Sequence, residues 1–228
     1  MEITFLGHAA FLLEGGGAKV LIDPFLTGNP KASVSADEVE ADAILLTHGH
    51  GDHIGDTVAI AQRTGAPVAA VVELAAELSE DLGEGHTVHS YNLGGTVNFD
   101  WGWVKLVPAW HTSTTPKGTP SIAAGLVVNI DGTTVYHLGD TALFGDLELI
   151  GRRSGPIDVA IMPIGGWYTM DRHDAVFAAE LVGARQVIPC HYDTMPAIAT
   201  DAEAFKADVE RATTSQVVIL QPGASHTP

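Results

Sequence analysis

The fold is decided by the stretch Thr47-His48-Gly49-His50-Gly51-Asp52-His53, which places three imidazoles and one carboxylate within six consecutive positions. These side chains are good ligands for a divalent metal of borderline softness. The apolar run Ala43–Leu46 precedes them and a helical pattern starts at Ile54, which predicts a strand, a tight loop and a helix. We expect Gly49 and Gly51 to adopt backbone angles that other residues avoid, so that the ligands converge. A histidine-rich surface loop or a tag would not interleave glycine and aspartate after a buried strand, so the motif predicts a metal site.

Three further ligand-type residues follow predicted strands later in the chain. His111 comes directly after the β-type run Trp103–Trp110, Asp140 follows Val135–Leu138, and His191 follows Cys190. The ends of strands collect functional residues in layered α/β proteins, so we expect these side chains to join the motif. Seven ligands are too many for one tetrahedral metal and suit two adjacent ions with open positions for water. The seven are His48, His50, Asp52, His53, His111, Asp140 and His191.

The remaining pattern predicts one domain, residues 1–228, in which two sheets face each other with helices outside. In the first part we expect strands at Glu2–Leu6, Ala9–Leu13, Lys19–Asp23, Ala43–Leu46 and Val68–Val72, and helices at Asp56–Arg63 and Glu73–Leu82. From Thr87 to Asp140 the pattern is β-type, with a two-residue hairpin turn at Asp131-Gly132. After it we expect helices at Leu143–Arg153, Asp174–Val182 and Ala202–Ala212, and strands at Asp158–Ile164, Gln186–Cys190 and Gln216–Leu220. Asp42–His48 and Asp158–Ile164 have similar patterns, which hints at an internal duplication.

The composition restricts the partners and the compartment. The formal net charge is −17, from 11 Lys and Arg against 28 Asp and Glu, which disfavours nucleic acids and anionic membranes as partners. No basic start precedes the apolar stretch Ile3–Leu13, and no run reaches the roughly 20 apolar residues of a membrane span. Cys190 is the only cysteine, lies on a predicted buried strand and is expected to be an inert core thiol. These features predict a cytoplasmic protein.

The order of the ligand motifs resembles that of the metallo-β-lactamase superfamily, and the resemblance covers essentially the whole chain. It implies an α/β (α+β) fold, a four-layer αβ/βα sandwich with the metals at one edge of the sheets. Gly7–Glu14, Leu21–Pro24 and Pro163–Gly166 with Tyr168–Met170 look more closely like a bacterial and archaeal subfamily of metal-dependent hydrolases. That subfamily is distantly similar to L-ascorbate-6-phosphate lactonase and to phospholipase D-type enzymes that act on N-acylphosphatidylethanolamine.

The resemblance also implies how the ligands are shared between two divalent ions. The first ion would be held by His48, His50 and His111, the second by Asp52, His53 and His191, and Asp140 would bridge both. In the true β-lactamases of the superfamily a cysteine takes the place of Asp140. A ligand set of nitrogen and oxygen alone suits zinc, the expected metal, and also admits manganese, iron or nickel.

These expectations lead to a hydrolase of a small ester, lactone or phosphodiester. Two divalent ions, two carboxylates and a bridging hydroxide leave about one positive charge, which attracts an anionic small-molecule substrate. Metal binding lowers the pKa of water from about 15.7 to about 7, and we expect Asp52 to orient the resulting hydroxide. A phosphodiesterase or nuclease of the same superfamily and an iron-dependent redox enzyme on the same fold are the alternatives, and a binding protein without catalysis is disfavoured because every ligand position is filled. Relatives are often oligomeric, so a homo-oligomer is also expected.

Four residues outside the ligand set are candidates for supporting roles. His8 is either a turn histidine or a substrate contact, and Asp23 is either a turn residue or a carboxylate that orients a ligand imidazole. Tyr168 and Met170 follow two glycines and either pack within their loop or form a wall of the substrate pocket. His137 alternates out of phase with the ligand that follows its strand, so we expect it to face away from the metals.

Overall fold

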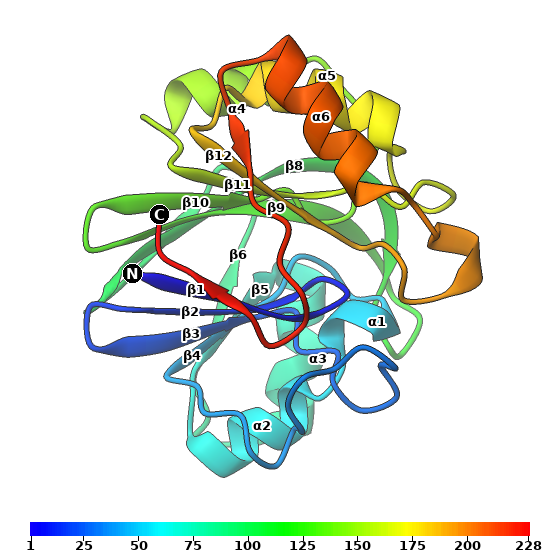
Figure 1. Ribbon diagram of the computed structural model, residues 1–228. Coiled ribbons are helices and arrows are strands. Elements are labelled where there is room, and N and C mark those ends of the chain that lie inside the picture. The colour runs from blue at the N-terminus through cyan, green and yellow to red at the C-terminus, as the bar shows by residue number, and fades with distance from the viewer.

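The computed structural model describes all 228 residues and consists of two seven-stranded sheets packed face to face, each covered by helices on its outer side. Figure 1 shows the helices α4, α5 and α6 above one sheet and α2 and α3 below the other. The four-layer αβ/βα sandwich that the motifs imply is therefore confirmed. No helix combines the length and the apolar character that crossing a membrane requires.

The first sheet is built mainly from the N-terminal half of the chain. Its strands follow the order β14 (Ser225–His226), β1 (Glu2–Gly7), β2 (Ala10–Gly15), β3 (Ala18–Ile22), β4 (Ala43–Leu45), β5 (Val68–Val71) and β6 (Val88–Tyr91). Strands β3 to β6 are parallel and the others pair antiparallel. The covering helices are α2 (Thr57–Thr64) and α3 (Val72–Leu82), and the short α1 (Gly51–Ile54) lies at the sheet edge.

The second sheet repeats this plan with later residues. Its strands follow the order β13 (Gln216–Val217), β12 (Gln186–Cys190), β11 (Val159–Pro163), β10 (Thr133–His137), β9 (Pro120–Ile130), β8 (Gly102–Thr114) and β7 (Thr96–Phe99). Strands β10 to β13 are parallel, and β4 and β11 hold equivalent second places in the two parallel sets. This equivalence agrees with the duplication hint in the sequence. The covering helices are α4 (Leu147–Arg153), α5 (Arg172–Val182) and α6 (Ala202–Ala212), and η1 (Pro196–Ile198) follows β12.

Two apolar clusters hold the layers together. The larger contains 41 buried residues, among them Leu45 of β4 and Leu126 of β9, so it joins the facing sides of the two sheets. The smaller contains 20 residues and joins the second sheet, through Tyr136, to α6, through Phe205. Because burial of apolar surface is the main favourable term in folding, these clusters fix the sheets and the loops at their edges.

Three differences from the predicted elements have physical causes. His111 does not follow a strand but lies inside β8, where the pairing with β9 shifts register between Pro108 and Thr112. Such an irregularity re-aims a side chain without ending the strand. Helix α4 starts at Leu147 rather than Leu143 because a turn through Gly145 precedes it. The predicted strand Gln216–Leu220 shrinks to two residues at the sheet edge, where it has one neighbour only.

Candidate metal centre

The ligand-type residues lie together at the edge where the parallel strands of both sheets end. The loop after β4 carries His48 and His50, and α1 carries Asp52 and His53. The irregularity in β8 contributes His111, and the loops after β10 and β12 contribute Asp140 and His191. In Figure 1 this edge lies around the label α1, opposite the two chain termini. Three overlapping groups of ligand atoms within 4.8 Å of one another form here: His48, His50 and His111; His8, Asp52, His53 and His191; and His48, His53 and Asp140.

The first group consists of three imidazoles. The Nε2 atom of His48 lies 3.0 Å from Nδ1 of His50, which lies 3.4 Å from Nε2 of His111. The other ring nitrogen of His48, Nδ1, lies 3.0 Å from the hydroxyl oxygen of Thr47 and can donate to it. Nε2 of His48 is then left with a lone pair for a metal, and burial lowers the pKa of this imidazole well below its usual value, which favours the neutral form that binds metals.

Asp140 connects the first group to the second. Its Oδ1 lies 3.3 Å from Nε2 of His53, and its Oδ2 lies 3.3 Å from Nε2 of His191 and 3.6 Å from Nε2 of His111. The carboxylate therefore faces imidazoles of both predicted ligand sets. Asp52 closes the second group, with Oδ2 3.7 Å from Nε2 of His191.

The donor atoms fit a metal ion by their burial and their lack of other partners. Nε2 of His53, Oδ1 of Asp140 and both ring nitrogens of His191 are buried without a hydrogen-bond partner. Buried polar atoms are costly when they remain unpaired, and a cation at this place would satisfy those that face the centre. The set offers only nitrogen and oxygen donors, which suits zinc, manganese, iron or nickel.

The charges of the centre also favour positive charge between the carboxylates and imidazoles. Burial opposes ionisation of Asp140, but His53 and His191 beside it hold the pKa of that carboxyl well below its usual value. Burial alone would lower the pKa of His191, but the neighbouring Asp140 carboxylate raises this pKa to about 9. The buried carboxylates thus attract positive charge, which protons on the imidazoles or metal ions can supply.

Asp23 fixes the ring of His53 from behind the centre. Its Oδ2 accepts a hydrogen bond from Nδ1 of His53 at 2.7 Å and another from the Thr47 hydroxyl at 2.6 Å, while Oδ1 accepts from the Thr47 N–H at 2.9 Å. Burial would raise the pKa of Asp23, but the neighbouring His53 holds it below its usual value. This contact directs Nε2 of His53 towards Asp140, and such carboxylate–histidine pairs commonly orient metal ligands.

His8 lies deeper in the centre than a substrate contact would require. Its Nε2 is 3.1 Å from Oδ2 of Asp52, its Nδ1 is 2.8 Å from the Thr194 hydroxyl, and its ring lies 4.0 Å from that of His191. His8 therefore positions Asp52 and supports His191. Thr194 escaped sequence analysis because a lone threonine in a loop carries no signal for such a contact.

The ligand side chains converge through a backbone geometry that differs from the one predicted from the sequence. Gly49 and Gly51 do not adopt positive φ angles, whereas His8, Asp23 and His191 do, at 60°, 44° and 53°. Gly49 is required for another reason, since a Cβ atom there would lie 2.6 Å from the carbonyl oxygen of Thr114. Non-glycine residues in the left-handed region cost on the order of 1–3 kcal/mol each and cluster at functional sites. The strain lies at one candidate ligand, His191, and at the two residues that position ligands, His8 and Asp23.

Comparisons with known proteins identify the family of the chain. Residues 2–191 match the model of the beta-lactamase superfamily domain. The chain belongs to this superfamily. It is 49% identical over 223 residues to a UPF0173 metal-dependent hydrolase of Thermococcus kodakarensis, covering 98% of this chain and 97% of the relative. A metal-dependent hydrolase of the same family from Pelotomaculum thermopropionicum is 48% identical over 230 residues, with 99% of each chain covered. The resemblance inferred from the motifs is confirmed.

A solved structure extends the likeness to three dimensions. The metallo hydrolase Igni18 from the archaeon Ignicoccus hospitalis KIN4/I has a TM-score of 0.88 and 34% identity, covering 99% of this chain and 97% of that one. The superfamily fold thus holds along nearly the entire chain, including the loops that carry the centre.

The superfamily centre of this chain opens into a cavity of about 400 Å³. The metal-site residues that line it are His50, Asp52, His111 and Asp140, and the other lining residues are Phe25, Thr112, Tyr168 and Met195. Tyr168 lies on the wall of this cavity, which is one of the two places predicted for it. Met170 does not, because its side chain is 3% exposed and packs in the smaller apolar cluster. Met195, at 37% exposure, lines the cavity instead, and no sequence pattern indicated it.

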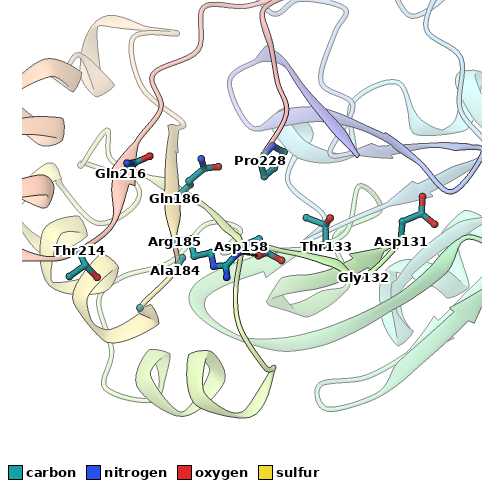
Figure 2. Close-up of a pocket in the computed structure, with 11 residues that line it drawn as sticks. Asp131, Gly132, Thr133, Asp158, Ala184, Arg185, Gln186, Thr214, Gln216 and Pro228 are labelled. Carbon is teal, nitrogen blue, oxygen red and sulfur yellow. Dashed lines mark hydrogen bonds and ion pairs between the residues drawn. The ribbon is translucent and has the colours of Figure 1, made fainter.

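Two other features of the molecule lie outside the centre. His137 is buried with both ring nitrogens engaged, since Nε2 lies 3.1 Å from the Ala9 carbonyl and Nδ1 accepts from the Gly139 N–H at 3.0 Å. A polar cleft of about 670 Å³ lies at the opposite ends of β10, β11 and β12, and Figure 2 shows the residues that line it. Asp158 pairs there with Arg185 at 3.3 Å. No imidazole lines this cleft, so it does not extend the metal centre.

Proposed function

We propose that the protein is a dinuclear metal-dependent hydrolase that acts on a small ester, lactone or phosphodiester. The observation that carries the proposal is the convergence of seven ligand-type residues beside an open cavity, with Asp140 within 3.6 Å of imidazoles of both expected sets. His48, His50 and His111 would hold one ion, Asp52, His53 and His191 the other, and Asp140 both. The expected metal is zinc, and the same donors accept manganese, iron or nickel.

The bound ions would supply an activated water molecule and polarise the bond that is hydrolysed. The side chain of Asp52 is 34% exposed and lines the cavity, so it would be placed to orient that water. His8 holds Asp52 in this position through its Nε2 atom. Tyr168, on the cavity wall, can donate a hydrogen bond from its hydroxyl to the substrate.

The electrostatics support a small-molecule substrate. The two ions exceed the charge of their carboxylate ligands, which leaves the centre locally positive in an acidic protein. The net charge of −17 disfavours nucleic acids and anionic membranes, and we propose neither as a partner. A cytoplasmic location and assembly into a homo-oligomer complete the proposal, and the single buried cysteine is consistent with a reducing compartment.

The test is to strip the protein with a chelator, reload it with zinc, manganese, iron or nickel, and measure hydrolysis of a lactone, p-nitrophenyl acetate and bis-p-nitrophenyl phosphate. We expect hydrolysis to return only with metal. His50→Ala should lower kcat/KM by about 100-fold or more, because it removes a ligand outright. His173→Ala, which changes an exposed histidine on α5, should have no effect.

Three results of this experiment have distinct meanings. Turnover that survives metal removal, or that is unchanged in His50→Ala, contradicts the proposed function. Hydrolysis of bis-p-nitrophenyl phosphate alone identifies a phosphodiesterase of the same superfamily. Oxygen consumption by the iron-loaded protein without hydrolysis of any ester identifies the redox alternative.

A further inference from the structure

Exposed apolar side chains gather beside the metal centre. Nine large hydrophobic residues of the protein are exposed, and five of them line one groove. The five are Leu93 at 38%, Trp110 at 69%, Ile122 at 39%, Trp167 at 80% and Tyr168 at 54% exposure. Single exposed apolar residues are ordinary, but a contiguous patch marks a surface that binds something.

The groove opens into the metal-site cavity. Its volume is about 740 Å³, and seven of its ten lining residues are hydrophobic. His111, Thr112 and Tyr168 line both the groove and the cavity. A molecule whose reacting bond lies beside His111 can therefore place its remainder along the groove without leaving the site.

One wall of the groove is tied to the metal-bearing loop. The Trp110 N–H donates to the Thr141 hydroxyl at 3.0 Å, and the Trp110 carbonyl accepts from the Ala142 N–H at 3.0 Å. The Trp110 ring lies 6.4 Å from that of Phe144. Since Thr141 follows Asp140 directly and Trp110 precedes His111, the position of this indole is coupled to two ligand residues.

A second part of the groove lining is a loop that holds its aromatic tip under strain. The bridge between Gly165 and Asp171 closes the loop, and the Met170 N–H donates to the Thr141 carbonyl at 2.9 Å. At the tip, Trp167 has a φ of 59°, which is unfavourable for a bulky residue, and is nevertheless the most exposed large apolar side chain. Folding alone does not favour a strained, exposed tryptophan, so its position points to a ligand.

We propose that this groove, formed by Trp110, Trp167, Tyr168, Ile122 and Leu93, binds the apolar part of the substrate. The substrate class is an ester or lactone that carries an acyl chain or an aryl group. This inference rests on the proposed function. Hydrolysis forms the bond from the water oxygen to the acyl carbon and breaks the bond from that carbon to the alcohol oxygen, which receives a proton. The apolar group stays on the indole surfaces while the polar bond lies at the metals.

The test is the hydrolysis of ethyl esters from acetate to decanoate by the metal-loaded protein, followed by acid release. We expect kcat/KM to rise roughly twofold for each methylene, because full burial corresponds to about fourfold and an open groove covers about half of each group. The octanoate-to-acetate ratio of kcat/KM should fall about tenfold in Trp110→Ala and in Trp167→Ala, since each removes a wall. Phe177→Ala, which removes a 60% exposed aromatic side chain on α5 outside the groove, should leave the ratio unchanged.

Binding of decanoate, followed by tryptophan fluorescence, provides a second readout that does not need turnover. We expect binding to wild type and a loss of affinity of about fivefold or more in Trp110→Ala and Trp167→Ala. Metal-dependent hydrolysis with a flat chain-length series and no decanoate binding overturns the groove inference and leaves the proposed function standing. Decanoate binding through Trp110 without hydrolysis of any ester supports the groove and contradicts the proposed function. A stable dimer that Trp110→Ala dissociates in sedimentation assigns the groove to a second copy and overturns the inference.

Discussion

At the scale of single residues, the centre depends on side chains that hold the ligands as much as on the ligands. Asp23 orients the ring of His53 directly. Thr47 orients the ring of His48, and the Thr47 hydroxyl in turn donates to Asp23. One carboxylate therefore fixes the tautomers of two imidazoles from different positions of the motif. His8 holds the carboxylate of Asp52 in place through its Nε2 atom.

Asp23→Asn tests this arrangement. Asp23 accepts hydrogen bonds on both carboxylate oxygens, whereas an amide has one acceptor oxygen and an NH2 group in place of the other, so we expect metal affinity to fall about 10- to 100-fold. Competition with a chelator measures the affinity. Asp42→Asn is the matched control, because Asp42 also accepts a backbone hydrogen bond but lies exposed at the other end of β4. Equal affinities in both variants would show that Asp23 does not orient the ligands.

At the scale of elements, the metal motif packs against the end of β8, which α3 holds in place. The carboxylate of Glu77 on α3 accepts hydrogen bonds from the hydroxyls of Thr115 and Thr119 and from the Lys117 N–H. The same segment contacts the motif, since the Gly49 N–H donates to the Ser113 hydroxyl at 3.2 Å. A buried helix carboxylate thus fixes the loop on which the metal motif rests.

This contact predicts a pH dependence of stability. Burial would raise the pKa of Glu77, but the hydrogen bonds from Thr115 and Thr119 hold it below its usual value. A carboxyl whose pKa is lower in the folded state stabilises the protein above the unfolded pKa, about 4.5, and loses this effect as pH falls through the folded pKa. We expect Glu77→Gln to lower Tm at pH 7 and the difference from wild type to narrow below about pH 4.5.

Thermal unfolding between pH 3 and pH 7 measures this difference. Glu80→Gln on the same helix is the control, because Glu80 makes only an exposed ion pair with Lys117 and such pairs contribute little. A Tm difference that stays constant across this range would rule out the ionised Glu77 as the anchor.

At the scale of the whole molecule, the chain motifs predict the layers and the ligands, while the supporting contacts depend on the tertiary structure. Hydrophobic periodicity predicts the places of three elements: the strands β5 and β12 (Gln186–Cys190) and the helix α6 (Ala202–Ala212). His111 could not be placed inside β8, because a shift of register depends on the partner strand and leaves no local signal. The burial of Met170 and the place of Met195 on the cavity wall escaped prediction for the same reason, since burial is decided by which elements pack together.

The central claim is that the two sheets bring together ligands for two metal ions that share Asp140. The metal content of the reloaded protein, measured per chain by mass spectrometry, tests it most directly. We predict about two divalent ions per chain in wild type, and about one in His48→Ala and in His191→Ala, each of which disrupts a different set. One ion or none in the reloaded wild type, or an unchanged content in both variants, would contradict the account.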